Sequence, residues 1–287
     1  MKLSIVIPTF DTAAMTKRCC EAVLASLPAD AEVIVVDDGS RDDTASMMPP
    51  RVRVIRLEEN RGYAIAANRG VNESAGDIVL LLNSDAIVEA GALDAFLRAF
   101  EDDPRLGVAG ARLLNAGGTP QWSGGRTPTL PWMIGVVSGA GALARVFGAV
   151  SDKPAEVDWV SGAAMAFRRE VWDKAGGLSE RYRFYCQDID FCLDARALGW
   201  DVRIIEDARV IHAHGATIAP SHPLHYDPEK LWPDLVTWGS AHYSRFWWAP
   251  RARRILAGVA WLRAIAWKLR GRDAAPLIRA ARAIRRS

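Results

Sequence analysis

Short unbroken apolar runs, each followed by a segment with helical spacing, constrain the fold of this chain more than any other feature. A run of β-branched and aliphatic residues without polar interruption is typical of a strand that is buried on both faces. Strands that alternate with helices predict an α/β fold, in which a mostly parallel central sheet is flanked by helices. We expect the strands at residues 3–7, 32–36, 52–57 and 78–82, and the helices at residues 12–26, 41–48, 63–74 and 90–102.

The signals are weaker further along the chain. Residues 115–131 are rich in Gly, Thr and Pro and are expected to form a loop. Residues 132–150 are small and apolar, and their pattern leaves a helix and a flap as alternatives. After these we expect a strand at 162–167, a helix at 188–198, and two strands at 202–205 and 208–211.

Charge is distributed unevenly. The segment from Arg251 to the C-terminus carries 11 Lys and Arg residues and one acid, whereas residues 1–250 carry 25 basic and 33 acidic residues. Trp and Leu recur among these C-terminal cations at helical spacing, a pattern that suits an anionic lipid surface. A solvated helix packed on the body is the alternative. We therefore divide the chain into a main domain at 1–248 and a basic amphipathic helical tail at 249–287.

Cysteine usage and hydropathy bear on where the chain works. The four cysteines form no CxxC pair, and a chain of 287 residues can bury a core without disulfides. We see no signal-peptide pattern and no apolar stretch of about 18 residues. We expect a reduced, cytoplasmic protein that is peripheral at the inner face of the cell membrane if the tail binds lipid.

Polar clusters follow several of the predicted strands. In open α/β sheets ligands bind at the carboxyl ends of the strands. Asp37-Asp38-Gly39-Ser40 follows one strand, where a carboxylate can accept hydrogen bonds from a base or a ribose, although Asp-Gly is also common in turns. Asn83-Ser84-Asp85 follows another, where Asp85 suits a hard cation, although all three residue types also cap helices.

Two further candidates lie in the second half of the chain. Asp188 precedes a predicted helix, where it is either a stabilising first-turn acid or a general base for an acceptor hydroxyl. His212 and His214 follow a predicted strand, and one imidazole there would complete a metal site with Asp85. A structural histidine is the alternative.

Motifs of several other enzyme classes are absent from the sequence. There is no GxGxxG after the first strand, no GxxxxGK[ST] loop and no GxSxG elbow. These absences disfavour a dinucleotide-dependent oxidoreductase, a P-loop nucleotidase and an α/β-hydrolase.

Taken in order, the motifs resemble family 2 glycosyltransferases of the GT-A fold, especially the bacterial rhamnosyltransferase-like branch. The resemblance covers about residues 2–217. It is carried by residues 4–10, 35–40, 60–64, 68–70, 81–85, 161–165, 168–170, 188–192, 199–200 and 212–215.

The resemblance implies a GT-A domain with a C-terminal helical extension and an inverting, metal-dependent sugar transfer. The donor would be a nucleotide-diphosphate sugar, with dTDP-rhamnose suggested by the branch alone. The acceptor would be a hydroxyl of a glycan or polyprenyl-linked glycan in cell-surface polysaccharide synthesis, and the cofactor Mg²⁺ or Mn²⁺. Nucleic acid is not an expected partner.

The family motifs also imply a role for individual residues. Asp188 stands at the position of the catalytic base, and Asp85 with His212 at that of the metal ligands. The residues implied to bind the nucleotide-sugar are Pro8, Thr9, Asp37, Gly39, Asn60, Gly62, Asn68, Asn83, Ser84, Ser161 and Gly162.

The sequence departs from the family pattern in two places. Asn83 replaces the first carboxylate of the DxD motif, which leaves one carboxylate for the metal, and Gln187 replaces the acid before the base. A sugar-nucleotide pyrophosphorylase and a non-catalytic nucleotide- or glycan-binding module are the alternatives. The first would need a Gly-rich basic loop at residues 9–12, which is missing, and the retained carboxylates argue against the second.

Overall fold

The computed structural model of the chain describes residues 1–140, 157–182, 184–213, 228–242 and 249–286. Its internal contacts divide the chain into two compact units. The sheet unit contains Met1–Gly125, Ser151–Glu180 and Gln187–Thr217. The helical unit contains Arg126–Val150, Arg181–Cys186 and Ile218–Ser287.

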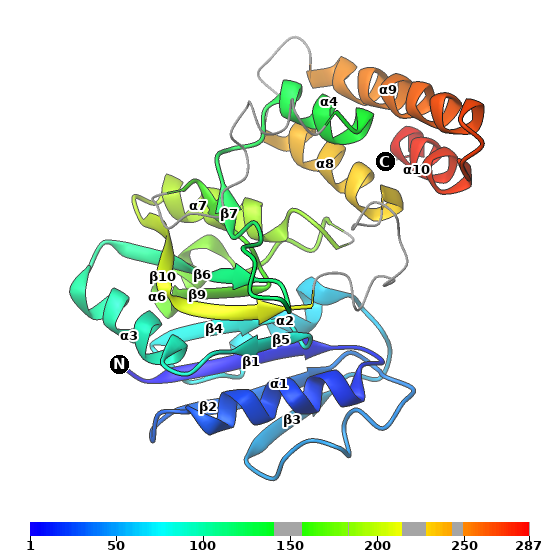
Figure 1. Cartoon of the computed structure of the whole chain (residues 1–287). Helices are drawn as coiled ribbons and strands as arrows, with labels where there is room; N and C mark the ends of the chain where they lie inside the picture. The colour runs from blue at the N-terminus through cyan, green and yellow to red at the C-terminus, as the bar shows by residue number, and fades with distance from the viewer. Residues whose placement is uncertain (141–156, 183, 214–227, 243–248, 287) are drawn as a thin grey trace. The chain divides into compact units, whose positions relative to one another are not determined.

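The sheet unit is built on one eight-stranded sheet with the strand order β3-β2-β1-β4-β9-β6-β10-β5 (Figure 1). The strands are β1 (Leu3–Thr9), β2 (Glu32–Asp37), β3 (Val52–Arg56), β4 (Ile78–Leu82), β5 (Ala86–Val88), β6 (Leu106–Leu114), β9 (Ala164–Arg168) and β10 (Asp201–His212). Strands β3, β2, β1 and β4 are parallel, as are β6 and β10, whereas β9 runs antiparallel between β4 and β6. The expected α/β fold with a mostly parallel sheet is confirmed.

Helices cover both faces of this sheet. They are α1 (Ala13–Ala25), α2 (Tyr63–Asn72), α3 (Ala92–Asp102), α6 (Arg169–Ala175) and α7 (Gln187–Ala197). Ile5 and Ile7 of β1 belong to the core that also contains Cys20 of α1 and Phe96 of α3. Val6 lies on the opposite face of the sheet and packs against α2: a Cβ added to Gly70 of α2 would lie only 2.4 Å from the Val6 Cγ1 atom. The unbroken apolar runs are therefore explained by burial on both faces.

Strand β6 lies in the interior of the sheet and was not predicted. Its sequence contains Gly107 and Gly110, which weaken a strand signal because glycine adds no side chain to the pattern. Both glycines allow close packing: an added Cβ would lie 2.5 Å from the Trp200 Cβ at the first position and 2.5 Å from the Val160 Cβ at the second.

Two local predictions were wrong. Residues 41–48 form bends and turns instead of a helix, and Asp42 accepts hydrogen bonds there from the Thr44 side chain and from the Ala13 backbone, the latter at 3.0 Å. Short polar side chains that bond to nearby backbone compete with helix formation. The two strands expected at 202–205 and 208–211 are one strand, β10, with an irregularity between Ile205 and Arg209.

The loop expected at 115–131 contains a short strand, β7 (Gly124–Gly125), which pairs with β8 (Trp159–Val160). The next segment begins as a helix, α4 (Leu130–Ser138), while residues 141–150 of the predicted helix or flap lie outside the described residues.

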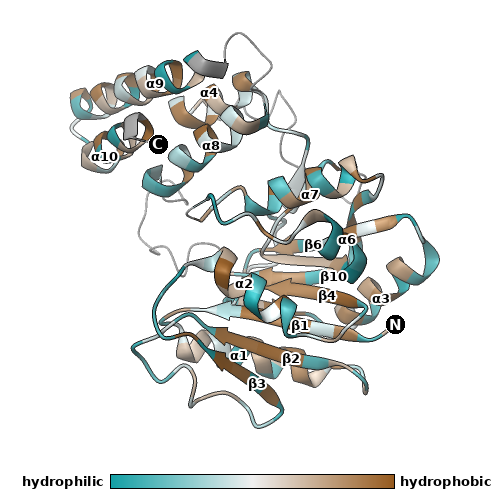
Figure 2. Cartoon of the chain, turned by 180° about the vertical axis from the view of Figure 1, so that it is seen from behind, coloured by the Kyte–Doolittle hydropathy of each residue, from teal (hydrophilic) through white to brown (hydrophobic). Residues whose placement is uncertain are grey.

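The described helices of the helical unit are α4, α8 (Pro228–His242), α9 (Ala249–Leu269) and α10 (Ala275–Arg286). The expected C-terminal helical extension is confirmed, and α9 and α10 share this unit with helices from earlier in the chain. Hydrophilic and hydrophobic residues alternate along both helices (Figure 2). Within the described residues, no helix combines the length and apolar character needed to cross a bilayer. The division at residue 248 stays a prediction.

Candidate active site

The carboxyl ends of several strands meet at one edge of the sheet. Strand β1 ends at Thr9 and β2 at Asp37, and the two end residues are register partners. Because β9 runs antiparallel to β4, its beginning lies at the same edge, where the Asn83 N–H donates to the Ala163 carbonyl at 2.9 Å. Residues that are far apart in the sequence are thereby brought together.

Asp37 is fully buried at the end of β2. One carboxylate oxygen accepts a hydrogen bond from the Ser40 N–H at 2.8 Å, and the other lies 3.6 Å from Arg56 Nε. That second oxygen has no hydrogen-bond donor among the described residues. Gly39 in this turn has φ +72°, and a Cβ there would lie 2.6 Å from the backbone of Glu59, so the turn requires glycine.

Asp38 connects this turn to the beginning of α2. Its two carboxylate oxygens accept hydrogen bonds from the Arg61 and Gly62 N–H groups, each at 2.8 Å. Burial raises the pKa of this carboxyl, and the two backbone donors partly oppose that rise. Sequence reasoning placed Asp38 within a motif but assigned it no role, whereas the structure shows that it holds Gly62 at its φ of +99°.

Thr9 is part of a buried hydroxyl network. Its Oγ1 lies 2.7 Å from both Thr12 Oγ1 and Thr16 Oγ1. Thr12 Oγ1 in turn lies 3.2 Å from Ser84 Oγ. Pro8 is buried within β1. The hydroxyl of Thr9 is therefore engaged with other hydroxyls inside the protein at this edge of the sheet.

Asn83, Ser84 and Asp85 form the tight turn between β4 and β5, so the helix-capping alternative is wrong for them. Strand β5 then pairs with β10 in a register that sets Ala86 opposite His212. His212 Nε2 lies 3.3 Å from Asp85 Oδ1 and 3.4 Å from Asn83 Nδ2. The expected pair of metal ligands, Asp85 and His212, is in contact. His214 lies outside the described residues.

The orientation of His212 is set by Gln121. The amide Nε2 of Gln121 donates to the His212 carbonyl at 2.6 Å and to Asn115 Oδ1 at 2.8 Å, which identifies it as the nitrogen. The amide oxygen therefore faces His212 Nδ1, at 3.2 Å, and accepts its proton. In the neutral imidazole Nε2 then carries a lone pair directed toward Asp85. Sequence reasoning missed Gln121, because nothing in its loop sequence marks it.

This geometry fits a divalent cation. Asp85 Oδ2 is buried and has no hydrogen-bond partner among the described residues. Asp85 Oδ1 and His212 Nε2 are two acceptors that face each other, an arrangement that a proton or a cation between them stabilises. No third His, Cys, Asp or Glu joins them within the part of the chain that the structure describes.

Asp188 lies in the first turn of α7, beside the beginning of β9. One of its oxygens accepts a hydrogen bond from the Gly162 N–H at 2.8 Å, and the other accepts from the Ile189 N–H at 2.9 Å. A Cβ added to Gly162 would lie 3.4 Å from the Asp188 Cβ. Burial raises the pKa of Asp188, and the backbone N–H groups oppose that rise.

Tyr63, at the start of α2, is buried near Asp188 and Asp85. Its hydroxyl donates to the Gly162 carbonyl at 3.3 Å. Burial raises its pKa, and the negative charges of Asp188 and Asp85 add to that rise.

The remaining predicted residues differ in their surroundings. Asn60 is exposed, and Ser161 accepts a hydrogen bond from the Ala163 N–H at 3.3 Å. The side chain of Asn68 is engaged within the protein: it donates to the Leu178 carbonyl and accepts from the Leu178 N–H, both at 2.9 Å. Asn68 therefore braces the segment after α6.

The comparison with known families bears directly on this site. A family model described as glycosyl transferase family 2 matches residues 4–174, which is more than half of the chain. The chain belongs to glycosyl transferase family 2. The matched range includes Asp37, Asp85 and Gly162.

Two curated relatives are similar to most of the chain. The N-acetylglucosaminyl-diphospho-decaprenol L-rhamnosyltransferase of Mycobacterium tuberculosis is 26% identical over 271 residues, covering 86% of this chain and 87% of that protein. The O-antigen biosynthesis protein RfbC of Myxococcus xanthus is 25% identical over 231 residues, covering 75% of this chain and 18% of that protein.

Solved structures confirm the fold. The mannosyltransferase PcManGT from Pyrobaculum calidifontis, in complex with GDP-Man and Mn²⁺, is similar with a TM-score of 0.61 and 19% identity, over 99% of this chain and 80% of that one. GalNAc-T7 with UDP, GalNAc and Mn²⁺ is similar with a TM-score of 0.58 and 16% identity, over 74% of this chain and 43% of that one. The chain shares with these neighbours the GT-A arrangement of sheet and helices.

Proposed function

We propose that this family 2 glycosyltransferase moves a sugar from a nucleotide-diphosphate donor to an acceptor hydroxyl with inversion at the anomeric carbon. The observation that carries the proposal is the position of Asp188. Its carboxylate is held by the Gly162 N–H at the same edge of the sheet as the Asp85–His212 pair.

Asp188 is the general base of the proposed reaction. It removes the proton of the acceptor hydroxyl, whose oxygen attacks the anomeric carbon from the face opposite the leaving diphosphate. Each carboxylate oxygen uses one lone pair for a backbone N–H and keeps another for the acceptor. A pKa raised by burial makes the ionised carboxylate a stronger base.

Asp85 and His212 would hold a divalent cation, Mg²⁺ or Mn²⁺. When bound, the cation neutralises negative charge on the leaving nucleotide diphosphate. Asp85 and His212 are the two ligands that the described residues offer, and diphosphate oxygens would take further coordination positions. Gln121 positions His212 for this role.

The donor nucleotide is proposed to bind along the ends of β1 and β2. Asp37 keeps one oxygen without a hydrogen-bond donor from the described residues, and a base or ribose would supply one. Gly39, Gly62 and Ser84 line this edge, together with the backbone at Pro8 and Thr9. Asn60, Asn83, Ser161 and Gly162 complete the proposed donor site, and Asn68 supports it through the Leu178 segment.

The donor sugar and the acceptor are proposed from the relatives. The Mycobacterium relative is named as a rhamnosyltransferase whose acceptor carries a sugar on a polyprenyl diphosphate. We propose an activated rhamnose donor, such as dTDP-rhamnose, and a polyprenyl-linked glycan acceptor. With such an acceptor, the chain would work at the inner face of the cell membrane.

A transfer assay tests the proposal. The purified chain is supplied with a panel of nucleotide-sugars, a polyprenyl-diphosphate-linked sugar, and Mg²⁺ or Mn²⁺. We expect a product whose anomeric configuration is inverted relative to the donor. A chelator should abolish product formation, and adding the metal back should restore it. Nucleotide-sugar binding without turnover in every combination would instead favour a non-catalytic binding module.

A further inference from the structure

Helix α9 has two opposite faces of different character. Its buried face consists of Ala252, Leu256, Ala257, Ala260 and Ala264. Its outer face carries large apolar side chains that are exposed to solvent: Ile255 (38%), Leu262 (69%), Ile265 (52%) and Leu269 (83%). Residues spaced by three, four and seven positions lie on one side of a helix, so these four form a continuous stripe. We call it the outer stripe.

Exposed cations border the outer stripe. Arg254 and Lys268 lie along one side of it, as the helical rotation of 100° per residue dictates, and Arg270 directly follows Leu269, the last residue of α9. Within the described residues, none of these three forms an ion pair with a carboxylate. The stripe is therefore bordered by uncompensated positive charge.

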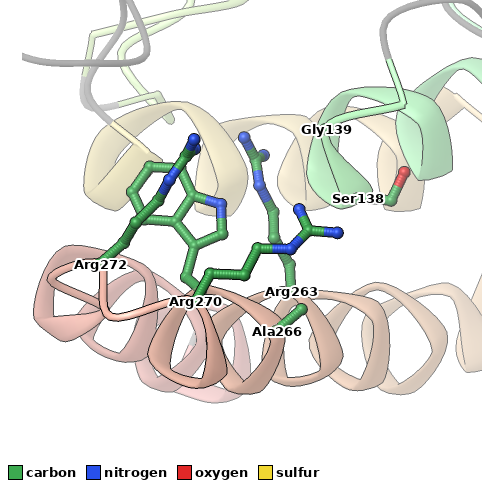
Figure 3. A pocket seen from close by; sticks show the side chains of 7 residues that line it. Ser138, Gly139, Arg263, Ala266, Arg270 and Arg272 are labelled. Atoms are coloured by element: carbon green, nitrogen blue, oxygen red, sulfur yellow. The ribbon is translucent and has the colours of Figure 1, made fainter.

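An arginine-lined pocket of about 430 Å³ lies next to this face. It is lined by Arg263, Trp267, Arg270 and Arg272 together with Ser138 and Gly139 at the end of α4. The three arginine side chains extend to the same side of α9 (Figure 3). Its lining contains no acidic side chain.

Contacts within the helical unit fix two of the residues that line this pocket, Arg263 and Arg272. Arg263 Nη1 donates to the carbonyls of Val136 and Val137 at 3.2 and 3.1 Å, which completes hydrogen bonding at the end of α4. The guanidinium of Arg272 lies over the Trp267 ring at 5.6 Å from its centroid. Gly139 has φ +78°, and a Cβ there would lie 2.7 Å from Arg263 Cζ. Arg263 is therefore held in place by its hydrogen bonds to α4, while the guanidinium groups of Arg270 and Arg272 can bind an anion.

We propose that the outer stripe and the adjacent arginine pocket together dock the chain on an anionic phospholipid bilayer. The aliphatic side chains of the stripe insert at the level of the acyl chains, while Arg270 and Arg272 bind lipid phosphates. Aliphatic stripes bordered by Lys and Arg are the arrangement of helices that lie in the plane of a membrane interface. Anionic leaflets attract such cations.

Charge and exposure argue against other occupants. Nucleic acid would be bound by the cations but would leave Leu262 and Leu269 in contact with phosphates, at no gain from their burial. A second copy of this helix would bring two cation-bordered stripes together and place like charges side by side. On an anionic bilayer, the apolar side chains are buried among the acyl chains and the cations contact the lipid phosphates, so both kinds of residue stabilise the bound state.

Vesicle co-sedimentation of the full-length chain tests the proposal. Vesicles contain phosphatidylcholine alone or phosphatidylcholine mixed with phosphatidylglycerol. We expect binding to the mixed vesicles that weakens in high salt. Leu262→Ser with Leu269→Ser should weaken binding by about 100-fold or more, because each leucine contributes about tenfold on burial. Arg270→Gln with Arg272→Gln should weaken it by about 25-fold, at roughly fivefold per cation.

Matched controls separate docking from general effects. Leu198→Ser removes an exposed leucine from the sheet unit, and Arg51→Gln with Arg98→Gln removes the same charge from exposed positions there. These variants should bind vesicles like the unchanged chain. Equal loss in the controls, or full binding by the Leu262/Leu269 variant, would overturn the proposal. So would RNA binding, or self-association, that the Leu262/Leu269 substitution abolishes while vesicle binding persists.

The docking surface is independent of the proposed chemistry. It lies in the helical unit, whereas Asp85, Asp188 and His212 lie in the sheet unit. Hydrolysis of a nucleotide-sugar by the Leu262/Leu269 variant should equal that of the unchanged chain. Vesicle binding by a chain that binds no nucleotide-sugar would contradict the proposed function and support the docking surface.

Discussion

Gln121 makes two hydrogen bonds to His212. Its Oε1 accepts from Nδ1 of the imidazole at 3.2 Å, and its Nε2 donates to the His212 backbone carbonyl at 2.6 Å. The ring is thereby held with Nε2 toward Asp85. Partners of this kind fix the tautomer of a ligating histidine and raise its affinity for metal. The proposed metal site therefore depends on a residue that itself binds no metal.

Replacing Gln121 should weaken metal binding without unfolding the chain. Gln121→Leu removes both hydrogen bonds, and we expect the affinity for Mn²⁺ to fall by about 10- to 100-fold. Water-proton relaxation with Mn²⁺ measures this without reference to turnover. Asn72→Leu, an amide-to-leucine change at an exposed position, is the control. Unchanged Mn²⁺ affinity in the Gln121 variant would remove Gln121 from the site.

Replacing Asp188 should separate chemistry from donor binding. Asp188→Asn removes the base, and turnover should fall by about 10² to 10⁴, the usual contribution of general-base catalysis. Calorimetry should show nucleotide-sugar affinity close to that of the unchanged chain. Asp173→Asn, at an exposed position on α6, should leave both quantities unaltered. Full turnover in Asp188→Asn would show that another group accepts the proton.

The pH dependence of transfer should report the environment of Asp188. Burial raises the pKa of this carboxyl above its ordinary value of 3.8, so it takes up its proton at a higher pH than an exposed aspartate. Because only the ionised form acts as a base, kcat/KM should fall as the pH is lowered through that raised pKa. A pH series of kcat/KM measures it. An acid limb at the ordinary aspartate value would contradict the role of burial.

The close packing of β6 should appear as a stability effect. Gly110→Ala places a Cβ 2.5 Å from the Val160 Cβ, and we expect a loss of about 1–3 kcal/mol in the free energy of unfolding. Gly117→Ala, where an added Cβ meets nothing within 4 Å, is the matched control. Denaturant unfolding measures both. Equal stability of the two variants would mean that β6 can move to accommodate the methyl group.

Much of the sheet unit could be predicted from the sequence, because its strands are buried on both faces and therefore unbroken in apolar character. β1, β2 and β4 show this directly. β6 could not be predicted, since Gly107 and Gly110 are there for the neighbours they admit, Trp200 and Val160. Such close approach is a property of the packed structure.

Some residues of the candidate site could also be predicted from the sequence, whereas the contacts between them could not. Asp37, Asp85 and Asp188 were marked by motifs at element ends, and Tyr63 lay within a motif without a role. Asn83–Asp85 do not cap a helix, because they are followed by strand β5. The sequence could not show this, since a three-residue strand is too short to give a periodic signal. Pairing of β5 with β10 is what places His212 beside Asp85.

The sequence by itself determined the alternation of strands and helices, the polar residues at the strand ends, and the excess of cations in the last 37 residues. Those features are local in the chain, and hydropathy and charge record them residue by residue. The tertiary structure alone decided that β9 runs antiparallel and brings Gly162 to Asp188, that Gln121 orients His212, and which side of α9 remains exposed. These depend on contacts between residues far apart in the sequence, which only packing of the chain brings together.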